Sequence, residues 1–266
     1  MAQQVSPSHI RKIILDQAKR ANVGHIGSAL SVADIITTLY FGVMTIPDPA
    51  DSDRDRFILS KGHAALALYA AFFLKGWITA EMLDSYCSDD TLLGVHPERL
   101  LRGVDFGTGS LGMGISYAAG AALAAMMQNS KRRVFVLVSD AECNEGIVWE
   151  SAMFAAHHKI SNLYVIIDLN GQQALGYTQN VLDTAPMSKK WEAFGWQVEE
   201  MDGHSREEIM NAIQACEQES ARPHVLIAHT TFGRGVSFME NKIKWHYWPM
   251  SQEEYRLALE NVEKLS

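Results

Sequence analysis

Two uninterrupted apolar runs lie near the centre of the chain, and each is followed at once by polar residues. They are Val134–Val138, which precedes Ser139-Asp140, and Leu163–Ile167, which precedes Asp168-Leu169-Asn170. Runs without polar alternation are typical of strands covered on both faces, as in a parallel sheet. The stretch between them, residues 149–159, has a helical pattern. This part of the chain therefore predicts a strand–helix–strand unit.

Apolar and polar positions elsewhere predict further elements of both kinds. In the first predicted helix the apolar residues recur on one face, and Ser8 is expected to be its N-cap. No linker separates the elements, so residues 1–266 are expected to form one α/β domain, with helices on both faces of a parallel sheet. The predicted helices are residues 9–21, 31–41, 62–74 (closed by Gly76), 113–127 and 205–220, and the further strands are residues 196–200 and 224–228.

The polar residues that follow the two central strands supply oxygen ligands. Asp140 and Asn170 are expected at the same sheet edge, because open α/β sheets bind ligands at the carboxyl ends of their strands. Mg²⁺ prefers carboxylate, amide and carbonyl oxygens, and the backbone carbonyl of Gln172 is a third candidate if Gly171 makes a tight turn. Spacing alone leaves a second interpretation open, in which Asp140 and Asn170 only cap a helix and a turn.

Composition excludes some classes of protein. The chain has 266 residues, of which 47% are hydrophobic and 20% charged, and a formal net charge of −8. This charge argues against a nucleic-acid-binding surface, although a local basic patch for a sugar phosphate remains compatible with it. No apolar run is long enough for a membrane span, and the N-terminus lacks a secretory signal. Three scattered cysteines suggest reduced thiols, so we expect a cytoplasmic protein.

Four histidines lie in short motifs, and imidazole exchanges protons readily near neutral pH. Each motif taken singly favours a structural or exposed residue over a functional one. The glycine-rich stretch Gly107–Gly112 is similarly ambiguous, because a tight turn before a helix would explain it. The motifs are Gly-His25-Ile-Gly, Ser-Lys-Gly-His63, His96-Pro-Glu and Trp-His246.

Taken together, these motifs resemble those of transketolases in order and spacing, from about residue 8 to about residue 250. The stretch Ser139–Gly146 followed by Asp168–Gln172 is similar to the thiamine diphosphate signature of that family. Ser139 and Ala141 replace its two glycines, and Ala141 disfavours the positive φ that glycine allows. The resemblance implies a thiamine-diphosphate-binding fold.

The resemblance also implies site residues, position by position. Glu145 matches a glutamate at the interface between protomers, although an exposed helix-terminal carboxylate is an equally good interpretation. The implied cofactors are thiamine diphosphate and Mg²⁺, for which Ca²⁺ or Mn²⁺ can substitute. The implied metal ligands are Asp140, Asn170 and Gln172; the catalytic residues are His25, His63, His96 and His246; the cofactor-binding residues are His63, Gly109, Leu111, Asp140, Ala141, Glu145, Asn170 and His246.

The implied activity is transfer of a two-carbon ketol unit from a ketose or its phosphate to a sugar aldehyde. In the family, a following pyrimidine-binding domain supplies an activating glutamate. The sequence ends at Ser266, so we expect a second subunit with that domain, in an α2β2 assembly. Tyr247-Trp248 stands where a glycine is usual, which suggests an uncommon acceptor. The alternatives are a subunit like 1-deoxyxylulose-5-phosphate synthase or a 2-oxo acid dehydrogenase α chain, and a catalytically silent subunit.

Overall fold

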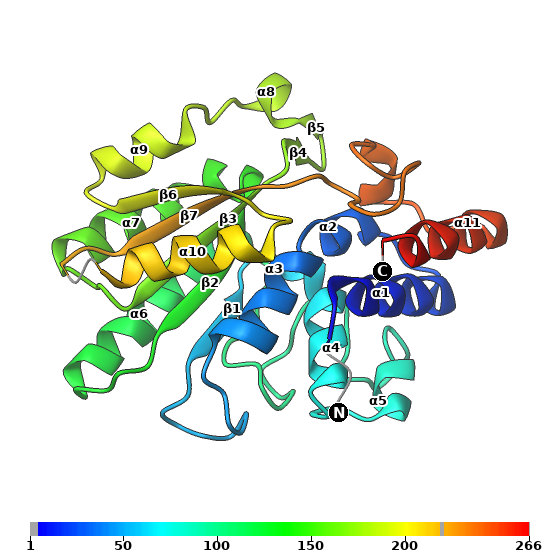
Figure 1. Cartoon of the computed structure of the whole chain (residues 1–266), viewed down its shortest axis with the longest axis horizontal. Coiled ribbons are helices and arrows are strands. Elements are labelled where there is room, and N and C mark those ends of the chain that lie inside the picture. Colours follow the sequence, from blue (N-terminus) through cyan, green and yellow to red (C-terminus); the bar gives the residue numbers. More distant parts are fainter. Residues whose placement is uncertain (1–4, 219–220, 266) are drawn as a thin grey trace.

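A five-stranded parallel sheet forms the centre of the computed structural model, which describes residues 5–218 and 221–265 (Figure 1). Its strand order is β1-β2-β3-β7-β6, and a two-stranded hairpin, β4–β5, stands apart from it. The predicted α/β fold class is confirmed. The strands are β1 Arg56–Leu59, β2 Val134–Ser139, β3 Leu163–Leu169, β4 Gln172–Gln173, β5 Gly176–Tyr177, β6 Gln197–Asp202 and β7 His224–His229.

The central strands are buried on both faces because successive side chains point into two separate cores. In β2, Phe135 and Leu137 pack in one core, whereas Val134, Val136 and Val138 pack in the other. This explains why the strand sequence has no polar alternation. The register pairs Ser139 of β2 with Asp168 of β3, which brings the carboxyl ends of both strands to the same height.

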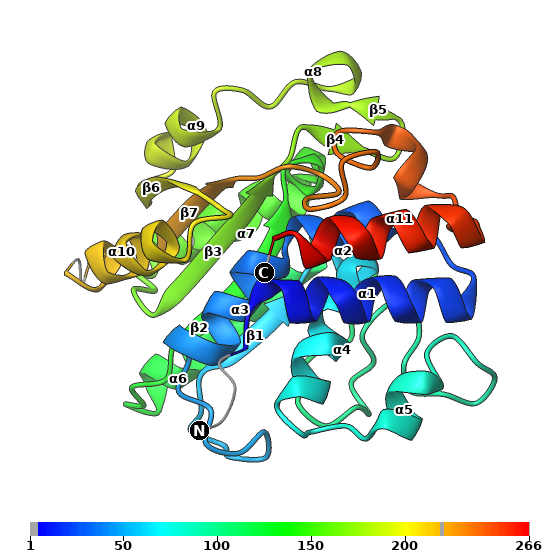
Figure 2. The same cartoon turned by 45° about the vertical axis from the view of Figure 1, so that its right-hand side comes forward.

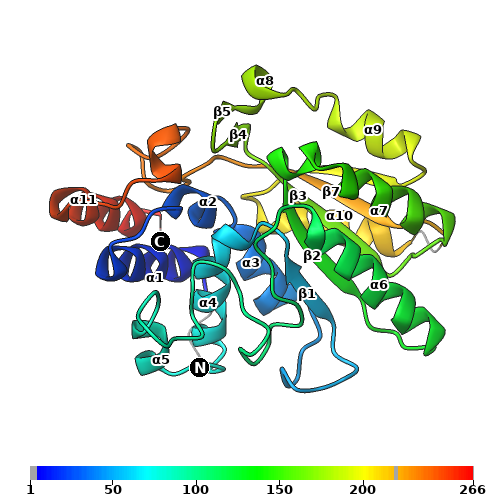
Figure 3. The same ribbon diagram turned by 180° about the vertical axis from the view of Figure 1, so that it is seen from behind.

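Helices cover both faces of the sheet. α3 and α10 lie in front of it in Figure 1, whereas α6 and α7 cover the opposite face in Figure 3. The helices are α1 Pro7–Ala21, α2 Ile26–Ser31, α3 Ala33–Thr38, the π-helical turn η1 Leu39–Val43, the 3-10 turn η2 Gly62–Ala64, α4 Ala65–Leu74, α5 Ala80–Asp84, α6 Met113–Met127, the 3-10 turn η3 Ala141–Asn144, α7 Gly146–His157, α8 Thr178–Val181, α9 Met187–Ala193, α10 Arg206–Glu217, the 3-10 turn η4 Ile243–His246 and α11 Gln252–Glu263.

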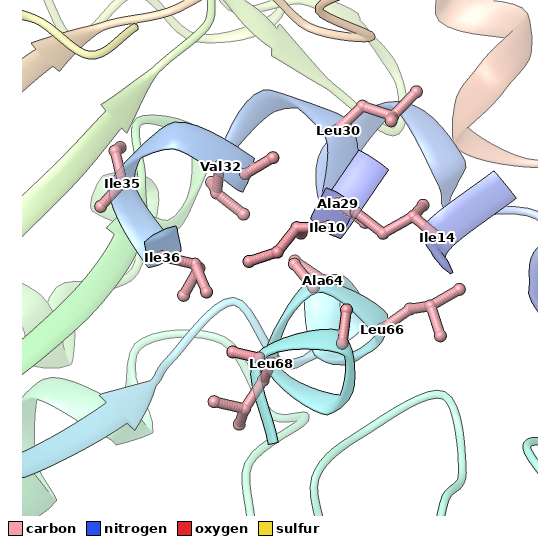
Figure 4. Close-up of a cluster of buried hydrophobic side chains, with 14 of the residues drawn as sticks. Ile10, Ile14, Ala29, Leu30, Val32, Ile35, Ile36, Ala64, Leu66 and Leu68 are labelled. Atoms are coloured by element: carbon pink, nitrogen blue, oxygen red, sulfur yellow. The ribbon is translucent and has the colours of Figure 1, made fainter. Parts of the chain in front are cut away.

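The N-terminal helices extend the front core beyond β1. α1 and α11 run side by side (Figure 2), and α1 also packs on α4. Ile10 and Ile14 of α1 lie beside Ala29 of α2 in a cluster of buried side chains (Figure 4). None of the helices in the described part of the chain combines the length and apolar character needed to cross a membrane.

Several predicted boundaries were wrong. The first helix begins at Pro7 with Ser6 as its N-cap, so Ser8 is a buried helical residue rather than the cap. Within the helix predicted for residues 31–41, Ser31 ends α2, Val32 leaves the α-helical region of the backbone, and α3 follows and continues into the π-helical turn η1. The helix predicted for residues 149–159 begins earlier, at Gly146, and ends at His157. The predicted end at Ser220 lies outside the described residues.

Candidate active site

A cavity of about 370 Å³ opens at the carboxyl edge of the sheet. The segments that follow β1, β2 and β3 meet there, because parallel strands all end at this edge. Ten of the eleven residues predicted for the site line the cavity. They are His25, His63, His96, Gly109, Leu111, Ala141, Glu145, Asn170, Gln172 and His246.

Asp140 lies beneath the cavity lining and is fully buried. Its carboxylate accepts hydrogen bonds from the backbone N–H groups of Ala141 and Gly171, both at 2.8 Å. The Asn170 amide oxygen accepts a bond from the Gln172 N–H at 3.0 Å. Gly171 adopts a positive φ of 72°, as the predicted tight turn requires. Both side chains therefore act as caps, and this leaves carboxylate and amide lone pairs for a cation.

Burial and the nearby Asp168 charge raise the pKa of Asp140 to about 7. A buried carboxylate next to a second carboxylate is costly to ionise, and a bound cation would offset that cost. Among the described residues, no group of three or more His, Cys, Asp and Glu side chains could hold a metal ion. The predicted ligand set differs in kind, because it combines one carboxylate with an amide and a backbone carbonyl.

A buried ion pair that the sequence did not reveal lies beside these residues. The Lys61 ammonium, which reaches the cavity wall, pairs with the fully buried carboxylate of Asp168. Asp168 also accepts hydrogen bonds from Ser31, Thr230 and the Asn170 amide. Burial raises the pKa of Asp168, but the Lys61 charge and these hydroxyls outweigh it and hold the pKa below its usual range. Lys61 therefore brings a positive charge to the cavity wall.

A third buried carboxylate, Glu142, joins three of the segments that line the cavity. It accepts hydrogen bonds from the Ser60 hydroxyl, from the Gly112 N–H at 2.6 Å and from the Ser139 N–H at 3.2 Å. Burial raises its pKa. Because these donors come from the ends of β1, the glycine-rich loop and β2, Glu142 fixes the three segments relative to one another.

Three of the predicted histidines lie close together on the cavity wall. The rings of His25 and His63 lie 5.5 Å apart. The backbone N–H of His25 donates to the backbone carbonyl of His246 at 3.2 Å. Burial, followed by the Lys61 charge, lowers the pKa of His63 well below its usual value and that of His246 to about 4. Burial also lowers the pKa of His25. These imidazoles are therefore neutral at pH 7, and each presents one donor and one acceptor nitrogen.

His96 and the glycine-rich loop form the remaining side. A Cβ on Gly109 would lie 3.3 Å from the His96 ring, so the loop backbone packs against the imidazole. Ala141 begins η3 and avoids a positive φ, so the replacement of the family glycine requires no strained backbone here. Glu145 is exposed at the N-terminus of α7.

Several buried polar atoms around the cavity have no hydrogen-bond partner among the described residues. Such atoms are costly unless a ligand or water satisfies them. An oxygen-rich ligand with a cation fits this donor and acceptor set, so the residues present suit a metal-bound diphosphate. The atoms are His25 Nδ1, Asn144 Oδ1, Gln172 Nε2 and Oε1, Gln173 Nε2 and His246 Nε2.

Comparison with known proteins identifies the family. Residues 2–262 match the family model described as transketolase, thiamine diphosphate binding domain. The chain belongs to the transketolase family. It is 38% identical over 269 residues to the 6-deoxy-6-sulfo-D-fructose transketolase subunit SqwG of Clostridium sp. (strain MSTE9), covering 98% of both chains. It is 40% identical to an apulose-4-phosphate transketolase subunit of Phocaeicola vulgatus, covering 96% of this chain and 93% of that protein.

Solved transketolases have the same fold. The transketolase of Campylobacter jejuni superposes with a TM-score of 0.91 at 30% identity, covering 97% of this chain and 42% of that one. The prediction of a thiamine diphosphate-dependent transketolase subunit, made from the histidine and metal motifs, is thus confirmed at the level of the family. The same matches favour it over the synthase and dehydrogenase alternatives.

Proposed function

We propose that this chain provides the diphosphate- and metal-binding half of a transketolase that moves a two-carbon ketol unit from a ketose or ketose phosphate to a sugar aldehyde. The observation that carries the proposal is the cavity itself. It brings the motif histidines into one cavity with the oxygen ligands at the ends of β2 and β3, and the Lys61 charge lies beside those ligands. Transketolase chemistry needs both halves of this arrangement, a cofactor anchor and groups that move protons on a sugar.

Asp140, Asn170 and the Gln172 carbonyl would hold the cation, which we propose to be Mg²⁺. Hard oxygen ligands suit Mg²⁺, and the lone pairs left after capping leave room for diphosphate oxygens. The other proposed cofactor contacts are supported by their position on the cavity wall. His63 and His246 would contact the diphosphate, Gly109 and Leu111 would contact the rest of the cofactor, and Ala141 and Glu145 would lie at its edge.

Thiamine diphosphate, when bound, supplies the carbon nucleophile and the electron sink for the ketol unit. His25, His63 and His96 would hydrogen-bond the sugar hydroxyls and hold or transfer protons at their ring nitrogens. The lowered pKa values of His25 and His63 suit this role, because a neutral imidazole can accept a proton. Lys61 would add a positive charge close to the anionic cofactor.

A partner chain would complete the enzyme. The two relatives described above carry the names of transketolase subunits, and this chain covers 42% of the Campylobacter jejuni chain. We propose that a second chain supplies the pyrimidine-binding domain and its activating glutamate in an α2β2 assembly. Cys87, Cys143 and Cys216 are free thiols, which supports the cytoplasmic location that we propose.

The substrate is proposed to be a less common sugar. The names of the two relatives refer to 6-deoxy-6-sulfo-D-fructose and to apulose 4-phosphate. Tyr247 and Trp248, which replace a usual glycine, are half-exposed or more. They support an acceptor other than the common pentose phosphates.

The test begins with the purified chain and the product of a neighbouring gene that encodes the second half. Calorimetric titration with thiamine diphosphate and Mg²⁺ should show binding by the pair, and ketol transfer should require both chains. Substantial transfer by this chain alone would contradict the need for a partner. Cofactor binding without transfer across a screen of phosphorylated and nucleotide-linked sugars would favour a silent subunit, and exclusive use of pentose phosphates would contradict the uncommon acceptor.

A further inference from the structure

The β4–β5 hairpin is too small to hold its own position over the cavity. Each strand has two residues, and a two-stranded hairpin is marginal in water even when it is longer. Leu175 in its turn is 81% exposed, so little apolar burial fixes the tip. Yet Gln172, Gln173, Ala174 and Leu175 all line the cavity. Something outside the hairpin must therefore fix its position.

Two tyrosine hydroxyls connect the hairpin to the segment around η4. Tyr247 donates to the Ala174 carbonyl at 2.8 Å, and Tyr177 donates to the Asn241 carbonyl at 3.2 Å. The first bond runs from the η4 segment to the turn of the hairpin, and the second runs from the hairpin to the η4 segment. Both segments lie beside one another above α2 in Figure 2.

Of these two bonds, the one from Tyr247 acts directly at the cavity. The Tyr247 ring lies 6.3 Å from the His25 ring. The Tyr247 backbone packs against the α1–α2 connection, since a Cβ on Gly24 would approach the Tyr247 carbonyl oxygen to 2.4 Å. Tyr247 is thus anchored on its backbone side, while its hydroxyl reaches the hairpin.

The hairpin also carries buried polar side-chain atoms whose hydrogen-bonding capacity the described residues leave unsatisfied. Both amide atoms of Gln172 and the amide nitrogen of Gln173 are buried without a hydrogen-bond partner among the described residues. An unpaired buried amide N–H is destabilising, and a bound oxygen atom that accepts its hydrogen bond would offset that cost. Gln172 is 3% exposed, so bulk water does not satisfy it.

We propose that Tyr247 is a positioning residue that holds the hairpin so that the Gln172 and Gln173 side chains bind oxygen atoms of the ligand in the cavity. Only the identity of that ligand rests on the proposed function. The shared chemistry is an oxygen that accepts an amide N–H, and it belongs either to the cofactor diphosphate or to a sugar hydroxyl. The role differs from that of the Gln172 backbone carbonyl, which we assign to the cation.

The first experiment measures hydrogen exchange in the full chain without ligand. Tyr247→Phe removes one hydroxyl, and the amides of residues 172–177 should exchange about two- to tenfold faster, the loss expected for one hydrogen bond. Tyr255→Phe is the matched control, because it removes a bond of 2.8 Å from the Tyr255 hydroxyl in α11 to Asp16 in α1, and neither residue belongs to the hairpin. Unchanged exchange of residues 172–177 in Tyr247→Phe would overturn the positioning role, whatever the enzyme does.

The second experiment separates the two ligand sources in the assembled enzyme. Tyr247→Phe and Gln173→Met should each change one of two quantities by about two- to tenfold, with little change in kcat. Either the affinity for thiamine diphosphate with Mg²⁺, measured by calorimetry, falls, or the KM for the donor sugar rises. A lower cofactor affinity assigns the amides to the diphosphate, and a higher donor KM assigns them to the sugar. Wild-type values for both quantities in both variants would overturn the ligand contact. If the wild-type enzyme binds no thiamine diphosphate, the proposed function fails while the exchange result stands.

Discussion

The two sides of the cavity are built in opposite ways. One side, here called the floor, consists of Lys61, Asp140, Glu142 and Asp168, and all four side chains are fully buried. The other, here called the roof, consists of the β4–β5 hairpin together with Tyr247 and Trp248, of which Trp248 is 62% exposed. The floor is held by charged groups within the protein, whereas the roof is held by single hydrogen bonds.

This difference separates two tasks. Electrostatic interactions are strong where water is excluded, so the floor can hold a metal and an anion in a fixed geometry. Its polar groups lie at or just after the carboxyl ends of β1, β2 and β3, which the sheet itself positions. The roof lies on loops that tolerate substitution, and loops of this kind usually determine which ligand is accepted. We therefore expect floor substitutions to abolish binding or folding and roof substitutions to adjust specificity.

The largest expected effect comes from Lys61→Met. Removal of the ammonium leaves the Asp168 charge buried without its counter-ion, so the free energy of unfolding should fall by about 3–5 kcal/mol. Urea denaturation of the full chain measures it. Lys12→Met is the control, because Lys12 pairs with Asp16 at 2.7 Å on the surface and should lose only about 0.3–0.5 kcal/mol. Equal losses in the two variants would contradict the distinction between floor and surface pairs.

The next largest effect comes from Asp140→Asn. The substitution preserves shape but removes the anionic ligand, so affinity for thiamine diphosphate with Mg²⁺ should fall at least about 100-fold. Calorimetry on the assembled enzyme measures this loss. The metal-free protein should remain folded, because a buried carboxylate next to Asp168 is removed. Retained affinity would show that the cation is held elsewhere. Asp183→Asn, at an exposed loop position, serves as the control.

A third effect concerns His246, which precedes Tyr247 of the roof and is influenced by the Lys61 and Asp168 charges of the floor. Its pKa of about 4 in the folded chain lies below the ordinary value near 6.5, with burial the main cause. Between these two values the unfolded chain binds more protons than the folded chain, so stability is lost as the pH falls through this window. His246→Gln should reduce the slope of the free energy of unfolding against pH by an amount that corresponds to at most about one bound proton. Denaturation curves across this pH range would show identical slopes for both proteins if His246 does not titrate in this way.

Two of the strands that position the floor, and Asp140 within it, could be foreseen from local patterns, whereas the other buried charges could not. The apolar runs located β2 and β3 and their starts at Val134 and Leu163, because strands covered on both faces leave a continuous signal. β1 was missed, since four residues beginning with Arg56 give too short a pattern. The pairing of Lys61 with Asp168 joins positions 107 residues apart and depends on the strand register, which no local motif encodes.

The roof was harder to foresee for a related reason. Tyr247 was noted only as a departure from the usual glycine, and its partner Ala174 lies 73 residues away and binds through its backbone. A backbone acceptor leaves no trace in side-chain identity. The Gln172 and Gln173 amides likewise gain their meaning from burial, which the sequence of a short polar hairpin does not indicate.

The smallest expected effect, and the one that decides what the roof does, comes from Trp248→Ala. Because Trp248 is largely exposed, the free energy of unfolding should change by no more than about 0.5 kcal/mol. If the side chain shapes the acceptor site, the ratio of kcat/KM between two acceptors of different size should shift by about two- to tenfold. If it packs against the partner instead, that ratio should stay constant while the two chains associate more weakly, as sedimentation at several concentrations would reveal. A variant unchanged in both measurements would show that Trp248 contributes neither to acceptor choice nor to association. Within the roof, only Tyr247 and the hairpin would then contact the ligand, and acceptor specificity would have to come from the partner chain.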